Sequence, residues 1–197
     1  MPDILKNITN GCRVSWRKVA MTAMILVLLI PGVPTPLAGA GSQEYQVKAA
    51  FIHNVAKFVQ WPATTLIDPE EPFGLYILGE DRFGEAFDTF KGSMLHNRPL
   101  VVGKIEIWED IPADCRILFI GVPERTEIQR VLAKVSDRAI LTISDEPGFG
   151  EMGGMIGLVT ENQKIRFTVN TFSARKCGLM ISSNILKLAR SIYGEML

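Results

Sequence analysis

Residues 115–144 read CRILFIGVPERTEIQRVLAKVSDRAILTIS, and this stretch decides the fold. After its first residue, the segment from Arg116 to Gly121 is a continuous apolar run, which is typical of a strand covered on both faces. Glu124 to Ser136 follows with apolar side chains at helical spacing, and Ala139 to Ser144 is a second buried strand. A strand, a helix and a strand in this order predict a right-handed crossover between parallel strands.

The preceding part of the chain continues the same pattern. Phe73 to Leu78 is a short apolar strand, and Pro99 to Trp108 is a strand in which polar and apolar side chains alternate. Between them, the turn at Gly79-Glu80-Asp81 leads into a predicted short helix that ends at Phe90. Strands separated by helical segments favour a largely parallel sheet.

The segment from Tyr45 to Gln60 predicts a first helix, which Trp61-Pro62 ends. Its apolar side chains form one stripe on each side of the helix: Val47, Ala50, Phe51, Val55 and Phe58 on one side, and Ala49, Ile52 and Ala56 on the other. A helix that is apolar on two sides needs contacts on both. It is either sunk within its own domain, or it also contacts another helix or another chain.

The last third of the chain predicts a hairpin and more helix. A glycine-rich loop (Asp145 to Gly154) is followed by two strands of a hairpin (Met155 to Thr160 and Lys164 to Asn170), a helical turn (Thr171 to Lys176), and a last helix from about Ser183 whose inward stripe is Ile185, Leu188, Ala189 and Ile192. The predicted fold class is therefore α/β and Rossmann-like. It has a mostly parallel sheet, a C-terminal antiparallel hairpin and helices on both faces.

The first forty residues predict a secretory signal peptide. Four basic residues (Lys6, Arg13, Arg17 and Lys18) precede an apolar run from Val19 to Ile30, and Ala38-Gly39-Ala40 matches a cleavage site. The run is shorter than the roughly 20 apolar residues that a membrane-spanning helix needs, which disfavours the alternative of an uncleaved anchor. We therefore expect cleavage near Ala40, no stable membrane insertion afterwards, and a single domain over residues 41–197.

Composition excludes some partners. The chain has 21 basic and 21 acidic residues, and removal of the basic leader leaves the exported domain slightly acidic. Such a balance attracts neither nucleic acid nor anionic lipid.

Cys115 and Cys177 are the two cysteines that follow the leader. They are candidates for a disulfide in an oxidising compartment, and the alternative is two buried thiols that pack as small apolar groups.

No motif predicts catalysis, a cofactor or a metal. The loop from Gly148 to Gly153 matches the glycine pattern of a dinucleotide site, but a strand follows it where that site needs a helix. Its apolar residues Phe149 and Met152 are instead expected to be displayed for a partner. His53 is expected on a helix surface and His96 in a loop, neither with ligand-like spacing.

Many short segments, in order and at matching spacing, resemble the YfiR-like family of Gram-negative bacteria. They cover nearly the whole exported chain: Glu44 to Phe51, Asn54, Lys57 to Pro62, Leu78 to Gly84, Arg98 to Leu100, Cys115 to Ile120, Leu141 to Asp145, Gly148-Phe149, Gly153 to Ile156, Ile165 to Phe167, Asn170, and Leu179 to Leu186. The resemblance implies a non-enzymatic periplasmic regulator with a Rossmann-like fold.

The resemblance also implies a partner. The best-known relative represses an inner-membrane diguanylate cyclase, an enzyme of cyclic di-GMP and biofilm control, by binding its periplasmic sensor domain. That relative forms dimers and responds to redox state through disulfides. Relatives often have a cysteine in the strand where this chain has Tyr76, so the resemblance does not imply a redox response for this chain. We expect a periplasmic homodimer that binds the periplasmic domain of a cyclase or sensor kinase.

The candidates for the partner interface are His53, Lys57, Trp61, Phe149 and Met152. One alternative is a small-molecule binding module that feeds a sensor kinase or receptor, with its ligand in the crevice at the strand ends near Gly79 and Gly121. An enzyme is a third interpretation. It would need His53 or His96 to act with a carboxylate from a distant loop.

Overall fold

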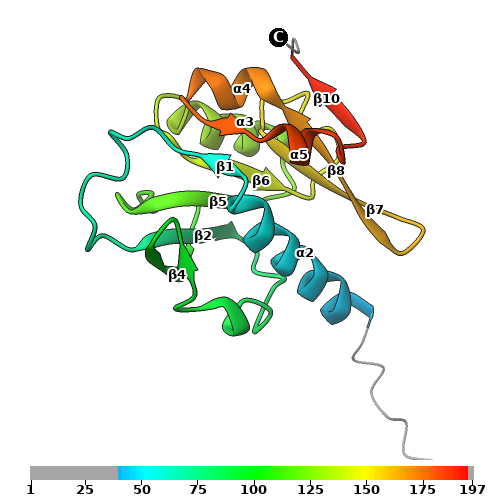
Figure 1. The fold of residues 1–197 in the computed structure, drawn as a ribbon. Helices are drawn as coiled ribbons and strands as arrows, with labels where there is room; N and C mark the ends of the chain where they lie inside the picture. The colour runs from blue at the N-terminus through cyan, green and yellow to red at the C-terminus, as the bar shows by residue number, and fades with distance from the viewer. Residues whose placement is uncertain (1–39, 195–197) are drawn as a thin grey trace, which may run out of the picture. The chain divides into compact units, whose positions relative to one another are not determined.

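The structure is a computed structural model that describes residues 40–194, and residues 1–39 of the predicted signal peptide lie outside that part. The elements, labelled as in Figure 1, are in chain order α2 (Ala40–Ala56), β1 (Val59–Gln60), β2 (Phe73–Gly79), η1 (Asp88–Phe90), β3 (Met94–Leu95), β4 (Arg98–Ile105), β5 (Cys115–Gly121), α3 (Arg125–Lys134), β6 (Leu141–Ser144), β7 (Ile156–Glu161), β8 (Lys164–Asn170), α4 (Thr171–Lys176), β9 (Met180–Ile181), α5 (Ser183–Leu186) and β10 (Ser191–Tyr193). Within residues 40–194, no helix is both long and apolar enough to cross a membrane.

One large sheet organises the domain, in the strand order β10-β8-β7-β6-β5-β2-β4-β3. Neighbours run parallel from β4 through β2, β5 and β6 to β7, and β10 is parallel to β8. The hairpin of β7 and β8 and the short pairing of β3 with β4 are antiparallel. These pairings confirm the predicted α/β fold with a mostly parallel sheet and a C-terminal hairpin. A separate antiparallel sheet joins β1 to β9.

The central strand β5 explains why helices cover both faces of this sheet. Every residue of β5 is buried. Ile117 and Phe119 point into one apolar cluster, whereas Leu118 and Ile120 point into another, as the alternation of side chains along a strand requires. The first cluster contains α2 and the second contains α3. Figure 1 accordingly shows these two helices on opposite sides of the sheet.

The first helix ends earlier than its sequence predicts. The helix α2 stops at Ala56, and Val59 and Gln60 form β1 instead of a last helical turn. Val59 lies opposite Ile181 and Gln60 opposite Met180, so the competing pairing comes from a segment close to the other end of the chain. A local helical pattern gives no sign of such a distant strand.

The C-terminal segment also differs from the prediction. The helix α5 covers Ser183–Leu186, with the side chain of Ser182 capping it, and the predicted helix does not continue through Ile192. Ile192 instead lies in β10, opposite Val169 of β8, and Leu188 is exposed. The hydrogen bonds that β10 makes cover the C-terminal part of the edge of β8 and leave a 3-residue strand at the edge of the sheet, where a long open edge would be a liability.

Candidate functional site

The inner side of α2 is fixed to the sheet by apolar contacts. Ala49, Ile52 and Ala56 are fully buried, and they contact the same cluster as Ile117 and Phe119 of β5. The predicted second stripe is therefore the inner side of the helix. The predicted first stripe is divided, because Val55 is buried whereas Val47 and Phe58 remain half-exposed.

A group of charged side chains fixes the N-terminal half of α2 to the carboxyl ends of the strands. The ammonium of Lys48 lies 2.5 Å from a carboxylate oxygen of Asp145, which follows β6, and 2.7 Å from Glu44. The hydroxyl of Tyr45 donates to the same oxygen of Asp145 at 2.7 Å. Only 4% of the Lys48 side chain and 9% of the Asp145 side chain are exposed. We call Glu44, Tyr45, Lys48, Arg82 and Asp145 the carboxyl-edge cluster.

The protonation states in this cluster follow from its hydrogen bonds. Burial by itself lowers the pKa of Lys48, but the hydrogen bonds to Asp145 and Glu44 outweigh burial and raise that pKa. The pKa of Glu44 is lowered by its hydrogen bonds with Lys48 and Thr160. Burial raises the pKa of Tyr45, so its hydroxyl keeps its proton.

Arg82 completes the cluster. Its guanidinium binds the carboxylate of Glu80 at 2.8 Å and lies 3.5 Å from the hydroxyl of Tyr45. Each charged group of the cluster thus has a partner of opposite sign within the protein. Such a closed network does not supply a free base or a free cation. Its effect is to position α2.

The opposite side of α2 remains open to solvent. Val47 is 50% exposed and Phe58 is 42% exposed, while Phe51 between them packs against Phe167 with ring centroids 4.8 Å apart. Met180, which is 60% exposed, lies opposite Gln60 in the β1–β9 sheet. Because directly opposed residues of an antiparallel pair point to the same side, Met180 is on the same side of that sheet as Gln60, and Phe58 immediately precedes β1.

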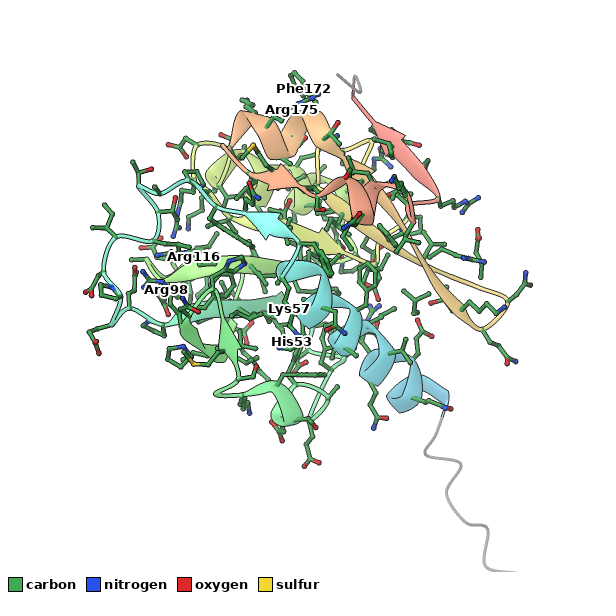
Figure 2. All side chains as sticks on the ribbon, in the orientation of Figure 1. His53, Lys57, Arg98, Arg116, Phe172 and Arg175 are labelled. Atoms are coloured by element: carbon green, nitrogen blue, oxygen red, sulfur yellow. The ribbon has the colours of Figure 1, made fainter. Side chains whose placement is uncertain are left out.

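We call Val47, Phe51, Phe58 and Met180 the outer apolar face. Lys57, which precedes Phe58 in the chain and lies just after α2 (Figure 2), is exposed, and its ammonium donates to Asn54 at 3.2 Å. Exposed apolar side chains that share one side of a rigid helix and sheet are what a protein–protein interface requires.

His53 does not lie on the surface as expected. Only 7% of it is exposed, because its ring stacks on Phe90 at 4.5 Å and its Nε2 lies 3.1 Å from the hydroxyl of Ser93. Burial, and then the nearby charge of Lys57, lower the pKa of His53. Trp61 is also buried, and its indole N–H donates to the carbonyl of Ala139 at 3.0 Å. Both side chains hold the domain together from within.

The glycine-rich loop does not display Phe149. Phe149 is 1% exposed and belongs to the cluster of α3, and Met152 is half-buried against the same cluster. The loop can fold its aromatic ring inward because of Gly154, where a Cβ atom would lie 2.1 Å from the ring. The small size of Gly154 therefore serves close packing.

The two cysteines among residues 40–194, Cys115 and Cys177, are free thiols. Cys115 is buried, donates to the carbonyl of Ile117 at 3.4 Å, and has its pKa raised to about 12 by burial. Cys177 donates to the carbonyl of Ser136 at 3.3 Å, and burial raises its pKa too. A thiol whose pKa is raised forms little of the reactive thiolate at neutral pH. Neither cysteine thus has the properties of a redox sensor.

The alternative ligand site was expected in the crevice near Gly79 and Gly121, where the two backbones lie close together. The N–H of Glu80 donates to the carbonyl of Gly121 at 3.0 Å, and a Cβ atom at Gly121 would lie 2.5 Å from the carbonyl oxygen of Glu80. The backbones at the ends of β2 and β5 are thus in contact where the crevice was expected. In the part of the chain that the structure describes, no three His, Cys, Asp or Glu side chains are grouped to hold a metal.

Comparison with known protein families matches residues 45–190 to the YfiR/HmsC-like domain. The chain belongs to the YfiR/HmsC-like family. The matched residues run from the first turns of α2 to the segment just before β10, so they include the carboxyl-edge cluster except Glu44 and the whole outer apolar face. The YfiR/HmsC-like family is known for periplasmic regulators of diguanylate cyclases, and it is not a known enzyme family.

Sequence reasoning missed the carboxyl-edge cluster and two buried arginines, Arg98 and Arg116. Asp145 was interpreted as a turn residue, and 97 residues separate it from Lys48. One signal was available, because Glu44 and Lys48 are spaced to pair along a helix. That spacing does not reveal that the pair is buried.

Proposed function

We propose that the chain is a periplasmic regulator that binds the sensor domain of an inner-membrane signalling protein and represses it. By analogy with the family, the partner is a diguanylate cyclase, and the resemblance extends the proposal to a homodimer. The observation that carries the proposal is the outer apolar face, which the family match includes. Large apolar side chains at the centre of an interface contribute most of its binding free energy.

The packing of α2 supports this use of its outer side. Its inner side is fixed by fully buried residues and by the pairing of Lys48 with Asp145, so little conformational entropy is lost when a partner docks. Lys57 adds a positive charge at the edge of the face, where charges mainly affect the rate and specificity of association.

Acidic substitutions on the outer apolar face are expected to weaken binding of the partner without unfolding the domain. Val47→Glu and Met180→Glu each place a charge where the partner would bury an apolar group, so we expect affinity to fall by about tenfold or more. The test is capture of the partner from detergent-solubilised membranes by the tagged full chain, with cyclic di-GMP measured in the same cells. Ile107→Glu is the matched control, because Ile107 is 39% exposed and lies outside the face.

Two results would contradict the proposal. If the unmodified chain repeatedly recovers no protein with a periplasmic sensor domain, the regulatory function itself is wrong. If the chain recovers such a protein and both face variants recover it equally well, the partner binds elsewhere.

The proposal includes export and removal of the leader. Cleavage after Ala40 would leave Gly41 as the first residue, which lies in the first turn of α2. We expect N-terminal sequencing of the protein from the periplasmic fraction to begin at or within a few residues of Gly41. Full-length protein that stays in the membrane fraction would support the uncleaved anchor instead.

A further inference from the structure

The loop over residues 62–72, between β1 and β2, is held by two arginines from other strands. Arg98, the first residue of β4, donates to the carbonyls of Leu66 at 2.8 Å and Glu71 at 2.8 Å, and it also contacts the carbonyl of Asp68. Only 5% of Arg98 is exposed. Figure 2 shows the Arg98 side chain beside this loop.

Arg116 of β5 holds the same loop from a second direction. Its guanidinium donates to the carbonyl of Thr65 at 3.0 Å and to the carboxylate of Glu71 at 2.7 Å, and it also reaches the carbonyl of Ala113 at 2.7 Å. Arg116 is 5% exposed as well. A buried guanidinium is costly unless acceptors surround it, so these two side chains strongly favour one conformation of the loop.

The side chains that this fixed loop presents to solvent are apolar and acidic. Ile67 is 76% exposed, and the exposed Asp68 and Glu70 follow it in the chain. The guanidinium groups of Arg98 and Arg116 point inward, where they donate hydrogen bonds to backbone carbonyls and to the carboxylate of Glu71. The outward surface of the loop therefore combines one branched apolar side chain with negative charge.

We propose that the loop over residues 62–72 is a recognition element that inserts Ile67 into an apolar pocket with a basic rim on the protein partner. The acidic flanks disfavour nucleic acid and anionic membranes, and they complement lysine or arginine side chains on a protein surface. A loop that is already ordered loses little entropy when it docks. This inference rests on the proposed function, because the partner is the same sensor domain, and it adds a second contact region.

The test uses the full tagged chain and the membrane capture described above. Ile67→Asp is expected to lower the affinity for the partner by about tenfold or more, with an unchanged melting temperature because Ile67 is exposed. Glu70→Lys is expected to weaken binding less than Ile67→Asp does, and its effect should be largest at low salt and disappear at high salt. Trp108→Asp is the matched control, because Trp108 is 80% exposed between Glu106 and Glu109 in a different acidic loop.

The outcomes separate this inference from the proposed function. If Ile67→Asp captures the partner as well as the unmodified chain while Val47→Glu does not, the inference is overturned and the proposed function stands. If Trp108→Asp weakens capture as much as Ile67→Asp, the effect comes from any exposed apolar group, and the inference is also overturned. If the unmodified chain captures no sensor protein, the proposed function fails, and this inference fails with it.

Discussion

Lys48→Ala is expected to lower the free energy of unfolding by about 3–5 kcal/mol, because it leaves the carboxylate of Asp145 buried without its cation. Asp145 would keep the hydroxyl of Tyr45 as a donor, but a hydroxyl does not compensate a buried negative charge. Urea titration of the purified domain measures the change. Lys57→Ala is the control on the same helix, since Lys57 is exposed, and we expect a change of at most about 0.5 kcal/mol there.

A double variant tests the cause. Lys48→Met combined with Asp145→Leu removes both charges and replaces them with apolar groups, so most of the lost stability should return. A loss below about 1 kcal/mol for Lys48→Ala alone would show that the pair is solvated in solution.

The pH range of this stabilisation follows from the direction of the shifts. The pKa of Lys48 is raised above its ordinary 10.5, so its contribution is complete below pH 10.5 and is lost as the pH rises beyond that value. The pKa of Glu44 is lowered from its ordinary 4.5, so its contribution is present above pH 4.5 and is lost as the pH falls. The cluster should therefore hold α2 in place over the whole range between.

Phe149→Ala is expected to cost about 3–5 kcal/mol of stability, the usual result when an aromatic side chain is removed from a core. Phe149 is fully buried in the cluster of α3, and its ring fills the space beside Gly154. Thermal and urea unfolding measure the loss. Met152→Ala in the same loop is the control, and it should cost less because Met152 is only partly buried.

This result distinguishes a core residue from an interface residue. If Phe149→Ala leaves stability unchanged and weakens partner capture, the loop displays Phe149 as the sequence suggested. If the variant unfolds at lower urea concentration, its loss of function needs no direct contact with the partner.

Local patterns were sufficient for the regular elements of the central sheet. The apolar run of β5 and the helical spacing of α3 correctly predicted a strand, a crossover and a parallel neighbour. The prediction succeeds because a strand that is buried on both faces needs a continuous run of apolar residues. Local periodicity predicts helix at Gln60 and at Ile192. Both residues lie in strands instead, because they pair with segments that are distant in the sequence. Such pairings depend on tertiary contacts that override local periodicity.

Side-chain exposure was harder to predict than secondary structure. The sequence predicts both His53 and Phe149 at the surface. His53 is buried because its ring stacks on Phe90, and Phe149 is buried because Gly154, which has no Cβ atom, leaves room for its ring. Arg98 and Arg116 gave no sign of their buried contacts, because all but one of the acceptors, the carboxylate of Glu71, are backbone carbonyls, which any sequence supplies. The family match, by contrast, was predicted from short segments read together, since their order and spacing were specific.

The docking of α2 has a consequence for the order in which the chain folds. Glu44 and Lys48, near the start of the helix, have partners 116 and 97 residues later, at Thr160 and Asp145. The helix α2 therefore cannot complete its contacts until most of the chain has been synthesised, and folds dominated by such distant contacts form slowly. This delay suits the export that we propose, because a chain that stays unfolded for longer stays competent for transport through a membrane channel for longer.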